Sequence, residues 1–177
     1  MQMYKGMHHT GITVSDLERS IAFYHGVLGL EFANEPTAVF SGPALEKGVG
    51  VPGGSLRQVS FWVGDSQMEL LEYRTPPSPN KAVPPNNALG AAHAAFLVDD
   101  IYAKKKELEA RGVTFYSDVN VVDDGPLAGW RWCYFADPDG VSLELVEVAY
   151  RKDEERAAAI AAYLAGGGNS GNSSNKG

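Results

Sequence analysis

Two short stretches of the chain alternate apolar and polar positions, and each precedes a segment with helical periodicity. Residues 8–14 and 92–98 alternate at every second position, which is typical of a strand with one buried face. Ser15-Asp16 and Asp99-Asp100 follow these stretches, and short polar residues of this kind favour the start of a helix. The pattern therefore predicts a strand followed by a helix, twice.

The positions after each helix predict three more strands in each half of the chain. Gly29 and Gly112 are expected to end the helices, because glycine tolerates the left-handed conformation found just after a helix. Asp137-Pro138-Asp139-Gly140 favours a tight turn between the last two strands. The predicted strands are 30–33, 57–63 and 67–73 in the first half, and 113–116, 130–136 and 142–148 in the second.

The two halves also resemble each other in sequence. Residues 9–17 match residues 93–101, and residues 68–72 match residues 143–147 in the same order, which favours a duplicated unit over coincidence. The chain is thus predicted to be α+β, with two tandem βαβββ modules that form a cupped mixed sheet. The expected segments are a first module at 4–75, a linker at 76–90, a second module at 91–150, a C-terminal helix at 151–165 and a disordered tail at 166–177.

One histidine and one glutamate in each module are predicted to share the sheet face that is turned away from the helices. Strand side chains alternate between faces, so the apolar residues cover the helix while His9, Glu69, His93 and Glu144 point the other way. If a pseudo-twofold axis relates the modules, these four side chains converge. Two imidazoles and two carboxylates suit Zn, Ni, Co, Mn or Fe(II) and leave positions open for a substrate.

The same four residues also allow a purely structural interpretation. A lone histidine in a strand is commonly a satisfied polar group, and a glutamate near a strand end can pair with a basic neighbour. The symmetric placement of all four favours the metal site, because two carboxylates buried together without a cation are costly.

Composition narrows the classes of function. The chain has 15 Lys and Arg against 22 Asp and Glu, a net charge of −7, and a pI near 5.0. This balance argues against a nucleic-acid or anionic-membrane partner. No apolar run spans a bilayer, the N-terminus carries no apolar signal segment, and the single cysteine, Cys133, suits a reducing compartment. We expect a cytoplasmic protein that acts on a small molecule, with Cys133 buried rather than nucleophilic.

On these motifs the chain resembles the vicinal oxygen chelate superfamily. This group includes glyoxalase I, methylmalonyl-CoA epimerase, fosfomycin-resistance enzymes, extradiol dioxygenases and bleomycin-resistance proteins. The resemblance covers about residues 7–149 and implies the glyoxalase-like fold, in which paired βαβββ modules form a cupped sheet around a metal. The segments that carry it are 9–17, 20–24, 28–30, 69–73, 93–101, 137–140 and 143–145.

The resemblance also implies a ligand set and a reaction. Glyoxalase I in its common form uses His, Glu, His and Glu, which His9, Glu69, His93 and Glu144 would supply. The implied activity is that of a lyase, isomerase or epimerase, in which a metal-bound glutamate moves a proton through an enolate or enediolate. Glu144 is favoured over Glu69 as the base, because methylmalonyl-CoA epimerases usually have glutamine at the latter position. An Fe(II) extradiol-type dioxygenase and a metal-free binding or resistance protein are the alternatives.

Four further residues, Arg57, Trp62, Trp130 and Tyr134, are candidates for substrate binding. An arginine in a sheet strand can hold an anionic group, and aromatic side chains line many small-molecule clefts. The arginine could equally be paired on the outer face, and aromatic residues at strand spacing often belong to the core. Whether one chain closes its own site or shares it across a homodimer stays open, because related proteins sometimes pair modules from two chains.

Overall fold

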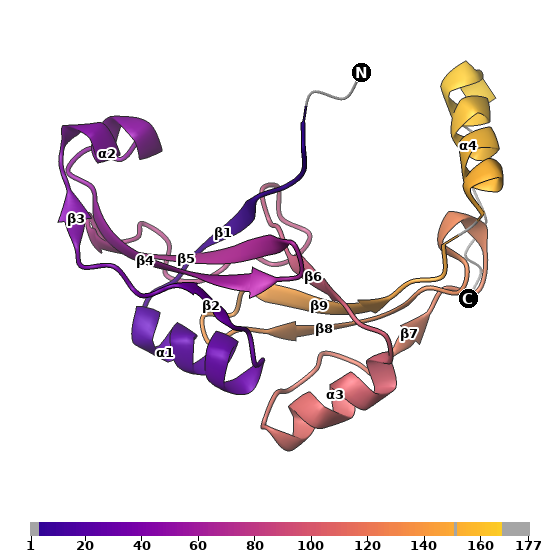
Figure 1. Ribbon diagram of the computed structural model, residues 1–177, viewed down its shortest axis with the longest axis horizontal. Coiled ribbons are helices and arrows are strands. Elements are labelled where there is room, and N and C mark those ends of the chain that lie inside the picture. Colours follow the sequence, from indigo (N-terminus) through magenta and orange to yellow (C-terminus); the bar gives the residue numbers. More distant parts are fainter. Residues whose placement is uncertain (1–3, 151, 168–177) are drawn as a thin grey trace.

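The protein has two modules whose sheets lie side by side, with both main helices on the same side of them (Figure 1). The computed structural model describes residues 4–150 and 152–167, so most of the predicted tail at 166–177 lies outside the described residues. Helices α1 (Leu17–Ile21) and α3 (Ile101–Ala110) cover one side of the sheets. Helices α2 (Pro43–Val49) and α4 (Asp153–Ala162) stand at opposite ends of the molecule (Figure 1).

The first module forms a mixed sheet with the strand order β1-β5-β4-β2, and β3 pairs with β4 outside this path. Strand β1 runs parallel to β5, whereas the remaining neighbours are antiparallel. A π-helical segment, η1, continues α1. The remaining elements are β1 (His9–Thr13), η1 (Ala22–Val27), β2 (Phe32–Asn34), β3 (Phe40–Ser41), β4 (Ser55–Val63) and β5 (Ser66–Thr75).

The second module repeats this plan in a sheet with the order β6-β9-β8-β7, in which β6 is parallel to β9. The βαβββ order therefore occurs twice, and the predicted α+β class is confirmed. Helix α4 follows this module and continues into a π-helical turn, η3. The remaining elements are β6 (Ala94–Leu97), β7 (Asn120–Val121), the 3-10 turn η2 (Gly125–Leu127), β8 (Arg131–Ala136), β9 (Ser142–Glu147) and η3 (Tyr163–Gly167).

Two segments differ from the sequence expectation. The stretch 113–116 does not form a strand of its own, because only Phe115 makes an isolated bridge, and β7 takes the third strand position instead. The segment Pro43–Val49 forms α2, which the pattern did not predict. Pro43 at the start of α2 and Gly50 after it, with φ at +70°, are the local signals for this helix.

One hydrophobic core joins the two modules. It combines the helix-facing side chains of both sheets with the inner faces of α1 and α3. Tyr24, Phe61 and Phe135 are fully buried within it, and so is Cys133. Burial raises the pKa of the Cys133 thiol to about 11, which is the behaviour of a small core residue. No helix in the described part of the chain is long and apolar enough to cross a membrane.

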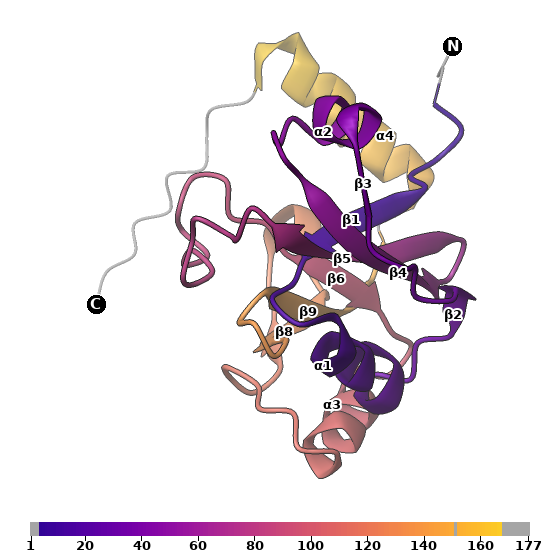
Figure 2. The ribbon, with the colours of Figure 1, turned by 90° about the vertical axis from the view of Figure 1, so that its left-hand side faces the viewer.

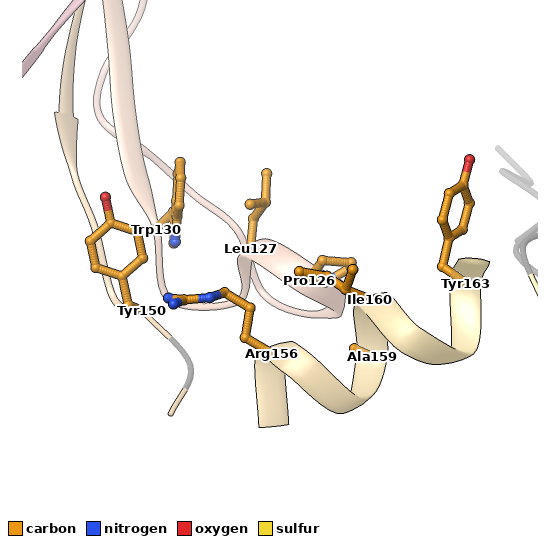
Figure 3. Close-up of a pocket in the computed structure, with 8 residues that line it drawn as sticks. All are labelled: Pro126, Leu127, Trp130, Tyr150, Arg156, Ala159, Ile160 and Tyr163. Atoms are coloured by element: carbon orange, nitrogen blue, oxygen red, sulfur yellow. The ribbon is translucent and has the colours of Figure 1, made fainter. Parts of the chain in front are cut away.

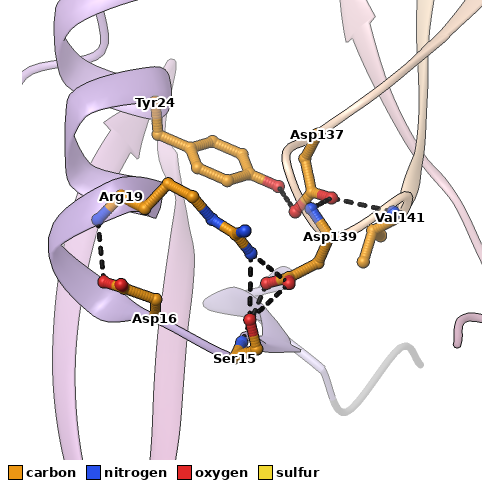
Figure 4. A network of polar contacts seen from close by, with 7 residues as sticks. All are labelled: Ser15, Asp16, Arg19, Tyr24, Asp137, Asp139 and Val141. Carbon is orange, nitrogen blue, oxygen red and sulfur yellow. Dashed lines mark hydrogen bonds and ion pairs between the residues drawn. The ribbon is translucent and has the colours of Figure 1, made fainter. Parts of the chain in front are cut away.

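A polar network fixes one module against the other, where the start of α1 meets the turn between β8 and β9 (Figure 4). The Ser15 backbone N–H and hydroxyl donate to the Asp139 carboxylate at 2.8 and 2.6 Å, and Arg19 pairs with the same carboxylate. The buried Tyr24 hydroxyl donates to Asp137 at 3.1 Å. We call these five residues the inter-module network. Figure 2 shows α1 and α3 on the same side of the sheets.

Candidate metal half-sites

The first candidate pair lies on the face of β1 and β5 that is turned away from the helices. Ile12 and Leu70 are buried on the helix side, so His9 and Glu69 lie on the other face. The register places Gly11 opposite Glu69, and a Cβ atom at Gly11 would lie 3.5 Å from the Glu69 carboxylate. His9 Nε2 is 3.7 Å from Glu69 Oε2, and both side chains remain accessible to solvent.

The second pair repeats this arrangement in the other module. Strand β6 is parallel to β9, and Ala95 lies opposite Glu144 as Gly11 lies opposite Glu69. His93 Nε2 is 3.1 Å from Glu144 Oε2. The Glu144 side chain is only 13% exposed and His93 is 46% exposed, so this pair is open to ligands chiefly from the histidine side. In each pair, one imidazole nitrogen faces one carboxylate oxygen.

A tyrosine distinguishes the second pair from the first. Tyr134 lies directly opposite Glu144 in the β8–β9 ladder, and its hydroxyl is 3.0 Å from His93 Nε2. Burial and the neighbouring Glu144 raise the pKa of Tyr134 to about 12, so its hydroxyl keeps its proton near neutral pH. Ser60 occupies the equivalent place opposite Glu69. The second pair thus has a tyrosine hydroxyl as a neighbouring hydrogen-bond donor, where the first pair has the shorter side chain of Ser60.

The four candidate ligands form two pairs rather than one cluster within a single chain. Among the described residues, no group of three or more His, Cys, Asp or Glu side chains is close enough together to hold a metal ion. Parity therefore places each pair on the expected face, but the modules are not oriented so that the pairs meet in the same chain. We refer to His9 with Glu69, and to His93 with Glu144, as the two half-sites.

Arg57, a candidate for substrate binding, lies on the opposite face of the sheet from the half-sites. It shares its strand face with the buried Val59 and Phe61, because the three positions have the same parity. Its guanidinium donates to Glu18 of α1 at 2.8 Å and lies 3.9 Å from Glu72. Arg57 therefore links the sheet to α1 through ion pairs with Glu18 and Glu72.

The two predicted tryptophans lie in different surroundings. Trp62 is 47% exposed near the end of β4 and lines an inter-module pocket that also contains Leu30 and Phe96. Trp130 precedes β8 and lines a separate pocket under α4, where its ring meets Tyr150. The sequence reasoning missed Tyr150 as a pocket residue, and its place after the last strand gives no periodic signal.

Comparisons with known proteins fit this geometry. A sequence profile of the Glyoxalase/Bleomycin resistance protein/Dioxygenase superfamily matches residues 6–145. The chain is 32% identical over 145 residues to 2-epi-5-epi-valiolone epimerase from an Actinomyces species, covering 80% of this chain and 79% of that protein. It is also 32% identical over 113 residues to mitochondrial methylmalonyl-CoA epimerase from Bos taurus, covering 63% of this chain and 57% of that protein.

Solved structures point in the same direction. A glyoxalase family protein from Bacillus cereus matches with a TM-score of 0.66 at 25% identity, over 83% of this chain and 96% of that chain. These relatives support an enzyme of the general vicinal oxygen chelate type. With a profile that matches most of its length and an epimerase relative over four fifths of it, the chain belongs to the Glyoxalase/Bleomycin resistance protein/Dioxygenase superfamily.

Proposed function

We propose that the protein is a metal-dependent epimerase, or a related lyase or isomerase, that binds two oxygens on neighbouring substrate carbons. It removes a proton from one of these carbons and returns it to the other carbon or to the opposite face of the same carbon. The observation that carries this proposal is the repeated His–Glu pair on equivalent parallel strands, with His9 near Glu69 and His93 near Glu144. The two epimerases among the relatives support the same class of chemistry.

The donor set of the half-sites fits a divalent metal. An imidazole nitrogen faces a carboxylate oxygen in each half-site, and Glu144 is largely buried, where a carboxylate without a cation is costly. His9, Glu69, His93 and Glu144 would hold the ion, for which Ni, Zn, Co, Mn and Fe are the candidates. When bound, such an ion supplies Lewis-acid stabilisation to an enolate oxygen.

The side chains around the second half-site have separate roles in this reaction. Glu144 is the proposed base, which removes a proton from the carbon next to a bound oxygen and returns it. The Tyr134 hydroxyl, 3.0 Å from His93 Nε2, donates a hydrogen bond toward the substrate oxygen or the glutamate. His93 orients the pair, and its Nε2 is the nitrogen that faces both groups.

We further propose that two chains close the site together. The inter-module network and the shared core hold the modules in an orientation that separates the half-sites, so the full set of four ligands requires a second copy. A twofold dimer would then combine His9 and Glu69 of one subunit with the partner subunit's His93 and the partner subunit's Glu144.

Metal content and proton exchange test this function. Purified protein is analysed for bound metal, and exchange in D₂O is followed on hemithioacetals of α-ketoaldehydes and on 2-methylacyl-CoA thioesters. We expect stoichiometric metal, exchange with one of the two substrate classes, and loss of exchange with a chelator. A metal-free protein that binds a ligand without exchange overturns the proposal in favour of a binding module. Oxygen consumption with catechols would instead identify a dioxygenase.

A further inference from the structure

An apolar pocket lies between α4 and the turn before β8, at the end of the second module (Figure 3). It has a volume of about 370 Å³, within the range of pockets that bind small molecules. The Arg156 side chain also lines the pocket and extends from α4 toward Tyr150 (Figure 3), and its guanidinium pairs with Asp153 of the same helix at 2.8 Å. The pocket is walled by Pro126, Leu127, Trp130, Tyr150, Ile160 and Tyr163.

A stripe of aromatic rings leads from the second half-site to this pocket. The His93 and Tyr134 ring centroids are 5.1 Å apart, and those of Tyr134 and Trp132 are 5.5 Å apart. Trp132 and Tyr134 lie opposite Val146 and Glu144, on the half-site face, and Trp130 has the same strand parity. Trp130 then contacts Tyr150 at a centroid distance of 5.9 Å inside the pocket. We call this run of rings the aromatic stripe.

The dimensions of the aromatic stripe set the length of a ligand that could use both ends. Trp130 and Tyr134 are four residues apart along an extended strand, a separation of about 13 Å. A linear arm of roughly ten carbons spans this distance, since extended methylenes advance a little over 1 Å each. Leu127, Ile160 and Tyr163 are each about half exposed or more in the free protein, so the pocket gains buried apolar area when an arm fills it.

We propose that the pocket holds the apolar arm of an elongated substrate whose two neighbouring oxygens lie at His93 and Glu144. This inference rests on the proposed function for the oxygen end, and it assigns the substrate class as long-chain or aryl-tailed compounds rather than small polar ones. The aromatic stripe guides the arm along β8, and α4 closes over its end. Arg156 contributes its aliphatic stem to the wall, while its guanidinium is paired with Asp153.

A chain-length series tests the proposal. Linear 2-hydroxycarboxylates of about six to eighteen carbons carry neighbouring oxygens at one end and an apolar arm at the other, so the longest arms extend past the roughly ten carbons needed to reach the pocket. Their binding to the full-length protein is measured by calorimetry, with and without added Zn²⁺. We expect affinity to rise about fourfold per methylene once the arm reaches the pocket, and to level off when the pocket is full. The same affinity at every chain length would overturn the proposal.

Matched variants locate the effect. Ile160→Asp and Leu127→Asp place a charge on opposite walls of the pocket, and both positions are about half exposed, so neither opens the core. Each is expected to reduce long-chain affinity at least tenfold and to leave short-chain affinity unchanged. Leu164→Asp, on the turn that continues α4 but outside the pocket wall, is the control that should keep the chain-length dependence.

Two outcomes separate this inference from the function on which it rests. If Zn²⁺ does not affect affinity but the chain-length dependence and the Ile160→Asp effect persist, the metal function fails and the pocket assignment stands. If Ile160→Asp retains the chain-length dependence, the pocket assignment fails whatever the metal result. Sedimentation of the same variant supplies a further check, because a dimer that dissociates on Ile160→Asp would show that a second copy fills the pocket, which overturns the proposal.

Discussion

Two carboxylates in the turn between β8 and β9 respond to the fold in opposite ways. Burial raises the pKa of Asp137 despite hydrogen bonds from Tyr24 and from the backbone. Burial alone would also raise the pKa of Asp139, but donation from Ser15 and the Arg19 charge bring it below the usual value. The charge on Asp137 therefore costs stability as pH rises above its unfolded pKa near 4, whereas the charge on Asp139 contributes stability there.

The Asp139→Asn variant tests this contribution. The substitution keeps the size of the side chain but removes the charge that Arg19 and Ser15 bind. We expect the free energy of unfolding at pH 7 to fall by about 1–2 kcal/mol in urea titrations. A depressed folded pKa gives stability that is present above the unfolded pKa and lost as pH falls through the folded one, so the difference between the two proteins should shrink below about pH 4.

A neighbouring aspartate provides the control for this experiment. Asp16 accepts a hydrogen bond from the Arg19 backbone N–H as the N-cap of α1, and asparagine performs this role about as well. Asp16→Asn should therefore change stability little at any pH. An Asp139→Asn protein that unfolds like the parent at pH 7 would contradict the assignment of the Asp139 charge to the inter-module network.

The two glutamates of the half-sites should differ in their effect on proton transfer. Glu144→Gln removes the proposed base and should lower the rate of substrate deuterium exchange by about 100-fold to 10,000-fold, because general-base catalysis contributes on that scale. Glu69→Gln is the matched change, and it should retain most of the exchange, since the resemblance implies that glutamine is tolerated there. Exchange is followed by NMR on protein with measured metal content. Equal losses in both variants would argue against Glu144 as the single base.

At the scale of elements, the start of α3 depends on two carboxylates that are far apart in the sequence. Asp100 accepts from the Ala103 N–H at 2.9 Å, and Glu147 of β9 accepts from the Ile101 N–H at 3.0 Å. Two of the four unpaired donors of the first turn are thereby satisfied. The helix start predicted from Asp99-Asp100 is borne out, with Asp100 as the cap.

The cap leads to a stability prediction with a control one residue away. Asp100→Ala should lower the free energy of unfolding by about 1 kcal/mol, the usual loss when an N-cap side chain is removed. Asp99→Ala removes an exposed carboxylate without a capping contact and should have little effect. Urea unfolding monitored by circular dichroism compares the three proteins. A larger loss for Asp99→Ala than for Asp100→Ala would show that the capping geometry is wrong.

Periodicity predicts the long elements well and the short ones poorly, for a physical reason. Strand β5, at Ser66–Thr75, alternates the buried Met68, Leu70 and Glu72 with less buried neighbours, so its pattern is strong. Strand β7 has only two residues, Asn120 and Val121, which pair with β8. Val113 and Phe115 instead pack into or against the core and form no strand. No local pattern records which of two short segments wins a place at a sheet edge.

At the scale of the molecule, parity predicted the face of each candidate ligand but not whether the pairs meet. Parity is a property of a single strand, and it places His9 and His93 on the face opposite the buried Ile12 and Leu145. Convergence depends instead on the angle between modules, which contacts across long sequence separations set. Ser15 and Asp139 are 124 positions apart, so no local pattern could indicate that their hydrogen bond fixes the modules.

Mixing two half-site variants tests whether two chains share one site. His9→Ala damages the half-site of the first module and His93→Ala that of the second, so each variant alone should lack stoichiometric metal and proton exchange. If the complete site combines half-sites from two subunits, an equal mixture that is unfolded and refolded together regains about a quarter of wild-type exchange, because half of the dimers are mixed and each of these has one intact site. Refolding each variant alone is the control. If one chain closed its own site, both chains of a mixed dimer would remain damaged, and the mixture would recover neither metal nor exchange.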